Sequence, residues 1–146
     1  MLGSLPVSTY ELEFYQDENG DEPVRRWLRE DLTPAKRKAI GRAMNAVLQT
    51  LGVGVCGTEF GKQLGGGLFE FRLRRDLRER TARGEDESVR VLLRVFCHAR
   101  GHKLILLLGA YDKGEHPSPR RQKAEIALAR ARLRDWRRRQ ALVERD

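Results

Sequence analysis

The fold is decided by one stretch, Lys62-Gln63-Leu64-Gly65-Gly66-Gly67-Leu68-Phe69-Glu70-Phe71-Arg72-Leu73-Arg74, in which three glycines lead into a segment of alternating character. Successive side chains of a β-strand point to opposite faces, so every second residue lies on the same side. The apolar face then carries Phe69, Phe71 and Leu73, and the opposite face carries Leu68, Glu70, Arg72 and Arg74. The pattern predicts a strand that buries one face and presents a carboxylate flanked by arginines on the other.

Two more strands are predicted downstream of this one. Residues 89–98 alternate between an apolar face and a face that carries Arg90, Arg94 and His98. Residues 103–111 are apolar on both faces, which is typical of a central strand covered on both sides. An antiparallel arrangement of the three strands would bring the arginines of neighbouring strands to the same side of the sheet.

The remaining segments are predicted to be one short strand, three helices and a charged loop. Residues 10–14 alternate and predict the strand, and the first helix after it is capped by Asp21. A second helix extends from its cap at Thr33 to Gly52, and a last, long helix begins at Ser118. Residues 76–88 are strongly charged, and we interpret them as an enlarged hairpin loop to which no fixed structure is assigned.

These segments predict a single domain over residues 1–146, with its core at about 10–137. We expect an α/β chain of the α+β type, with a small, mostly antiparallel four-stranded sheet. A two-helix hairpin covers one face of that sheet, and a C-terminal helix follows, ending in a basic tail at residues 137–146.

The charge of the chain indicates an acidic partner. The formal net charge is +8, and it is unevenly placed, at −1 over residues 1–73 and +9 over residues 74–146. This asymmetry favours a polyanion such as nucleic acid, although an acidic protein partner would fit the same pattern. Only two cysteines occur, too few for a disulfide framework, and no leader or membrane-length apolar run is present. We therefore expect a cytoplasmic protein with reduced thiols and no membrane association.

A groove of arginines suits phosphodiester chemistry. Guanidinium groups bind a phosphate bidentately and stabilise the charge that develops when phosphorus becomes five-coordinate. For RNA the nucleophile can be the 2′-hydroxyl of the substrate, so neither a metal nor an enzyme nucleophile is needed. Cys97 and His98 would point to opposite faces of one strand, which argues against a metal site there. The alternative is that the arginines are ordinary surface charges.

Three stretches of the chain resemble a known family of toxins. Residues 62–72 form a Lys-x-Leu-x-x-Gly-Leu-x-Glu-x-Arg motif, and residues 93–96 form an arginine-bearing strand. Residues 105–113 combine an apolar strand with a lysine loop, and prolines and an alanine-rich helix follow at residues 117–129. In this order they resemble the RelE/ParE superfamily, in its HigB-like, phage-derived branch, over about residues 10–137.

The resemblance implies a toxin of a type II toxin-antitoxin system. Such a protein is neutralised by a helix-turn-helix antitoxin, enters the ribosome and cuts mRNA without a metal or another cofactor. Carried over residue by residue, it places phosphate binding at Arg72, Arg94 and Lys113, and we assign proton transfer to Tyr111 or His116. Further basic residues are candidates for RNA binding, namely Lys62, Arg74, Arg90, His98, Arg120 and Arg121.

Two other functions fit the same sequence. A ParE-like inhibitor of gyrase would share the fold without being a nuclease. A basic adaptor would bind nucleic acid through its arginine-rich last helix without catalysis, and it would lose all activity when residues 137–146 are removed.

Overall fold

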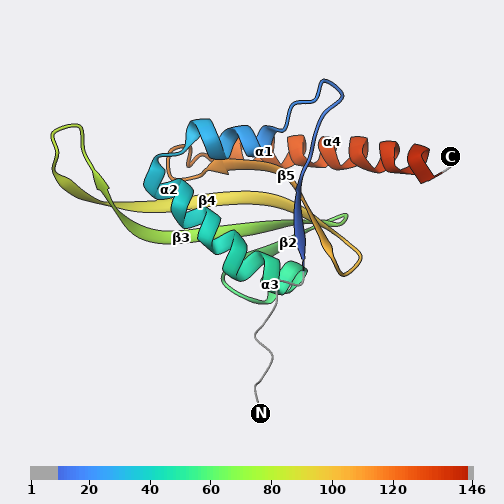
Figure 1. Ribbon diagram of the computed structural model, residues 1–146, viewed down its shortest axis with the longest axis horizontal. Helices are drawn as coiled ribbons and strands as arrows, with labels where there is room; N and C mark the ends of the chain where they lie inside the picture. The colour runs from blue at the N-terminus through green and yellow to red at the C-terminus, as the bar shows by residue number, and fades with distance from the viewer. Residues whose placement is uncertain (1–9, 145–146) are drawn as a thin grey trace, which may run out of the picture.

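The computed structural model describes residues 10–144 and shows an α+β fold built on a five-stranded, mostly antiparallel sheet (Figure 1). The strands follow one another across the sheet in the order β1-β5-β4-β3-β2. Their bounds are Glu11–Phe14 for β1, Gly61–Gly65 for β2, Leu68–Arg80 for β3, Asp86–Arg100 for β4 and Leu104–Asp112 for β5.

The prediction of four strands was wrong, because the residues before the triple glycine form a strand of their own. Residues 61–65 pair antiparallel with β3, and Gly65, Gly66 and Gly67 make the turn between them. All three glycines have positive φ angles, of 86°, 66° and 85°, a conformation that other residues rarely adopt. The glycines are therefore a hairpin turn with a strand on each side.

The prediction that residues 103–111 form a strand covered on both faces is confirmed, although the middle strand of the sheet is β4 and not this one. β5 lies between β4, to which it is antiparallel, and β1, to which it is parallel. Its residues Ile105 to Leu108 are fully buried, because both faces of the sheet are covered at this point.

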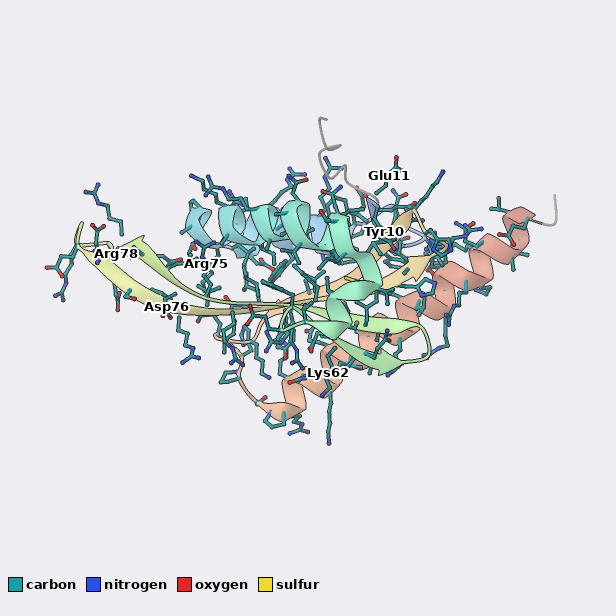
Figure 2. The ribbon with its side chains drawn as sticks, turned by 90° about the horizontal axis from the view of Figure 1, so that it is seen from below. Tyr10, Glu11, Lys62, Arg75, Asp76 and Arg78 are labelled. Atoms are coloured by element: carbon teal, nitrogen blue, oxygen red, sulfur yellow. The ribbon has the colours of Figure 1, made fainter. Side chains whose placement is uncertain are left out.

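Helices cover the two faces of the sheet separately, as Figure 2 shows. On one face, α1 and a π-helical turn are followed by α2, a second π-helical turn, α3 and a 3₁₀ helix. Their bounds are Pro23–Arg26 (α1), Trp27–Asp31 (η1), Pro34–Ala43 (α2), Met44–Leu48 (η2), Gln49–Leu51 (α3) and Gly52–Gly57 (η3). On the other face lies α4, Pro119–Glu144.

The predicted helix starts are confirmed at two of three positions. Thr33 accepts a hydrogen bond from the Lys36 backbone N–H at 3.3 Å, and Ser118 accepts one from the Arg121 backbone N–H at 3.1 Å. Asp21 does not cap α1, because its carboxylate is paired with Arg26 instead.

The helix α4 continues through the segment predicted as a basic tail, as far as Glu144. Arg130 donates to the carbonyls of Leu64 and Gly65, at 2.5 and 2.9 Å, and so ties the helix to the glycine turn. Arg137 donates to the carbonyl of Gly66 at 3.2 Å. Among residues 10–144, no helix is both long and apolar enough to cross a membrane.

The prediction of a long unstructured loop at residues 76–88 was wrong. β3 and β4 remain paired as far as Arg80 and Asp86, so only residues 81–85 form a turn. The charged residues concealed an alternating pattern, in which Leu77 and Val89 face the core beneath α2.

Candidate active site

The candidate site lies on the face of the sheet that carries α4, over β3, β4 and the end of β5. Paired residues of neighbouring strands lie on the same side of a sheet. Arg72 of β3 pairs with Arg94 of β4, and Arg94 pairs with Tyr111 of β5, so the three side chains form a row across the sheet. The helix contacts this face through Ala129, Leu133 and Trp136.

A buried carboxylate lies beside the two arginines. Glu70 has no exposed surface, and its Oε2 accepts a hydrogen bond from Arg72 Nε at 2.7 Å. Its Oε1 lies 3.6 Å from Arg94 Nε, an ion pair too long for a hydrogen bond. Glu70 thus fixes the positions of both guanidinium groups from beneath.

The buried guanidinium of Arg94 is incompletely neutralised. Arg94 is only 3% exposed, and its Nη1 donates to the Leu93 carbonyl at 3.1 Å. Burial lowers the pKa of Arg94, the attraction of Glu70 opposes that change, and the nearby charges of Arg72 and Arg74 add to the lowering. A positive charge held in this way would be stabilised by an anion.

Three arginines line one hollow, as the alternation predicted. Arg72, Arg74 and Arg94 surround a space of about 260 Å³, together with Glu59 and Phe60 from the segment before β2. At about 30 Å³ per water molecule, this space would hold roughly nine waters, which leaves room for a phosphate group.

Lys113 follows β5 and lies in the electrostatic field of the same arginines. It is half-buried, and its pKa is lowered by that burial and by the positive charge of Arg94. A lysine with a lowered pKa exchanges its proton more readily near neutral pH than an ordinary one.

Tyr111 is in the row but is less accessible. Its ring is buried, stacked on Phe96 with centroids 6.1 Å apart, and its hydroxyl has no hydrogen-bond partner among residues 10–144. Burial is the main cause of its raised pKa, and the negative charge of Glu70 raises it further. The guanidinium of Arg121 lies 5.9 Å from the ring centroid.

His116 lies in a different place from the arginines. It is exposed in the loop before α4 and lines a separate hollow of about 500 Å³ with Tyr111. That hollow also contains a buried ion pair, in which Lys36 Nζ donates to Asp112 Oδ2 at 2.7 Å.

The candidate RNA-binding residues divide between several parts of the molecule. Lys62 pairs with Glu70 in register and is exposed on the same side, while Arg90 is exposed farther along β4. His98 is turned toward α4, because its Nδ1 contacts the Gly67 carbonyl at 2.8 Å and its ring packs against Trp136. Arg120 and Arg121 lie in the first turn of α4.

Two features of the site were missed from the sequence. The alternation placed Glu70 on the polar face, yet the residue is fully buried and paired with the two arginines beside it. The ion pair of Lys36 and Asp112 was also missed, since the two residues come from elements far apart in the chain. A lone acidic residue between apolar positions of a strand is the signal that could have indicated the burial of Glu70.

The cysteines and histidines do not gather around a common point. Cys97 is free and fully buried in the core beneath α2, on the opposite face of β4 from His98, as predicted, and burial raises the pKa of its thiol well above the ordinary value. Within residues 10–144, no group of three or more His, Cys, Asp or Glu side chains is placed to hold a metal ion.

Comparison with family models, with curated proteins and with solved structures found no match to this chain.

Proposed function

We propose that this protein is the toxin of a type II toxin-antitoxin system, an endoribonuclease that cuts mRNA on the ribosome in the manner of the RelE/ParE superfamily. The observation that carries the proposal is the hollow lined by Arg72, Arg74 and Arg94, with Glu70 buried beside it. Three guanidinium groups against the two carboxylates of Glu59 and Glu70 leave a net charge of +1, which is complementary to the single negative charge of a phosphodiester.

In the proposed reaction the 2′-hydroxyl oxygen of the substrate attacks the adjacent phosphorus. The bond from phosphorus to the 5′-oxygen breaks, which leaves a 2′,3′-cyclic phosphate, and the 5′-oxygen takes a proton from water to become a free 5′-hydroxyl. Arg72 and Arg94 stabilise the negative charge on the phosphoryl oxygens, because Glu70 holds both groups in place before substrate arrives.

We assign proton transfer to Lys113 in place of the two residues first considered, because the positive charges of Arg94 and Arg72 act on its ammonium group. The Tyr111 hydroxyl is buried and its pKa is raised, so it is a poor base near neutral pH. His116 lines a hollow that none of the three arginines lines. The lowered pKa of Lys113, within the field of Arg94, suits a group that takes the proton from the 2′-hydroxyl.

The partners follow from the same proposal. The net charge of +8 favours association with ribosomal RNA and mRNA, and the resemblance to HigB-like toxins adds a helix-turn-helix antitoxin. The reaction as written requires no metal or organic cofactor.

The test is cleavage of mRNA during translation. The wild-type chain, Arg94→Ala and Arg94→Lys are each incubated with purified ribosomes and mRNA in the presence of a chelator of free transition metals, and the 5′ ends are mapped by primer extension. Loss of one group that stabilises developing charge costs about 10²–10³ in rate, and lysine cannot restore bidentate binding. Arg42→Ala, at an exposed position of α2, is the matched control.

Two results would count against the nuclease. One is an Arg94→Ala chain that is folded and cuts at the wild-type rate. The other is growth arrest with intact mRNA and an induced DNA damage response, which would instead select the gyrase inhibitor.

A further inference from the structure

The hairpin of β3 and β4 extends beyond the rest of the sheet as a two-stranded arm, residues 76–90. Its strands are paired from Asp76 and Arg90 outward, whereas the pairing of β4 with β5 ends at Leu93 and that of β3 with β2 ends at Phe71. Figures 1 and 2 show the arm projecting away from the body, at the end of the molecule opposite the C-terminus of α4.

The arm has a defined structure. Its base is anchored because Leu77 and Val89 pack against the core beneath α2. Its turn is closed by backbone hydrogen bonds, from Thr81 N to Glu85 O at 2.7 Å and from Gly84 N to Thr81 O at 2.9 Å. A two-stranded ribbon alone is marginally stable, so anchoring at the base and closure at the turn both favour a persistent shape.

The two faces of the arm differ in chemistry. The face toward α2 contains the two anchoring apolar residues and Glu79, which accepts a hydrogen bond from Thr33 Oγ1 at 2.5 Å. The outer face is exposed throughout and consists of Asp76, Arg78, Arg80, Asp86, Ser88 and Arg90.

The side chains of the arginines on the outer face make no polar contact within residues 10–144. In the part of the chain that the structure describes, Arg78, Arg80 and Arg90 form no ion pair and no side-chain hydrogen bond, unlike Arg37, whose guanidinium donates to three backbone carbonyls. Asp76 and Asp86 lie opposite Arg90 and Arg80 in the strand register, so three arginines against two aspartates give the face a net charge of +1. Exposed arginines on a rigid backbone are well suited to bind phosphates.

The outer face is continuous with the candidate active site. Arg74, which lines the hollow, lies two residues along β3 from Arg72, and Arg78 and Arg80 follow on the same side beyond Asp76. At about 3.3 Å per residue, Arg80 lies roughly 26 Å along the strand from Arg72. One polynucleotide strand that crosses the hollow can therefore run along the arm.

We infer that the outer face of the arm is a second RNA-binding surface, which holds the phosphate backbone of RNA away from the cleaved bond through Arg78, Arg80 and Arg90. The inference rests on the proposed function for its substrate class. It adds a binding site that is separate from the groups that act on the cleaved bond. Binding along a basic track without reading bases is common for single-stranded nucleic acids.

The experiment measures binding apart from cleavage. The probe is a labelled 2′-O-methyl oligoribonucleotide of about 12 nucleotides, which spans the arm and cannot be cut by a 2′-hydroxyl. Affinity is measured from 50 to 300 mM salt, about the range over which such contacts are resolved, for wild type, Arg78→Ala and the double variant Arg78→Ala/Arg80→Ala. Arg75→Ala is the matched control, because Arg75 is exposed on the same ribbon but on its other face.

The expected change follows from counterion release. Each lost phosphate contact on a single strand reduces the slope of log K against log salt by about 0.7, so the double variant should lose about 1.4. That change in slope corresponds to about 25-fold weaker binding at 0.1 M salt. Arg75→Ala should bind as wild type does, and circular dichroism should show that all variants are folded.

A second probe, purified ribosomes, distinguishes binding to the substrate strand from binding to ribosomal RNA. Weaker binding of the double variant to the oligonucleotide assigns the arm to the substrate strand, and weaker binding to ribosomes alone assigns it to ribosomal RNA. Unchanged binding to both overturns the inference, even if the wild-type chain proves to be a nuclease. Conversely, loss of binding with a wild-type chain that never cuts mRNA would refute the nuclease and leave the RNA-binding arm in place.

Discussion

Replacing Glu70 by glutamine tests how the site is held together. Glutamine keeps the shape of the side chain and removes the charge that lies 2.7 Å from Arg72 Nε and 3.6 Å from Arg94 Nε. Arg94, which is 3% exposed, would then lack its counter-charge. Removing one partner of a buried ion pair typically costs 3–5 kcal/mol. Because Arg72 is 31% exposed and solvated in part, we expect Glu70→Gln to lose about 3 kcal/mol, at the lower end of that range.

The assay is urea unfolding followed by circular dichroism at pH 7. With a slope of about 1.5 kcal/mol per molar urea, a loss of 3 kcal/mol lowers the midpoint by about 2 M. The double variant Glu70→Gln/Arg94→Met removes both members of the more deeply buried pair. Since replacing a whole buried pair is often neutral, its stability should return to within about 1 kcal/mol of wild type.

Two results would refute this reasoning. The first is a loss below about 1 kcal/mol for Glu70→Gln, which would mean that Arg94 does not depend on that carboxylate. The second is a double variant less stable than Glu70→Gln itself, which would mean that Arg94 contributes mainly through its packing.

Three further predictions concern stability. Thr33→Ala removes the cap of α2 and should cost about 1 kcal/mol in urea unfolding, whereas Thr33→Ser should keep most of it. Gly61→Ala would place a Cβ 2.6 Å from the backbone carbon of Val55, so it should cost about 2 kcal/mol or more, with Gly57→Ala, where nothing lies within 4 Å, as the control. The pKa of Asp135 is lowered to about 2, chiefly by the hydrogen bond that the Tyr15 hydroxyl donates to its carboxylate. The contribution of Asp135 to stability is therefore complete above about pH 4 and is lost as the pH falls through 2. Asp135→Asn should therefore be less stable than wild type at pH 7, and the difference should shrink in unfolding curves recorded from pH 4 to pH 2; a constant difference would contradict the assignment.

The arrangement of the arginines could be predicted because it depends only on strand periodicity. The period of two fixed the face of Arg72 and Arg94, and the antiparallel connection of their strands brought the two residues opposite one another. The same reasoning placed Cys97 on the other face of β4.

Other features could not be predicted, because periodicity gives the side of a sheet and not what covers it. Glu70 was placed on the polar face, but it is fully buried, and Arg94, one of the two arginines paired with it, comes from another strand. The arm was mistaken for a loop because only Leu77 and Val89 mark its inner face among many charges. The first strand of the hairpin at Gly61–Gly65 was missed because it is short and contains two glycines.

The parallel pairing of β1 with β5 has a consequence for how the protein is made. The first strand to leave the ribosome finds its partner only after the last strand, about ninety residues later, has been synthesised. Until then the nascent chain lacks the strand that lies between β1 and β4. A growing polypeptide therefore cannot assemble the row of Arg72, Arg94 and Tyr111, and the site should form only when translation of the chain is nearly finished.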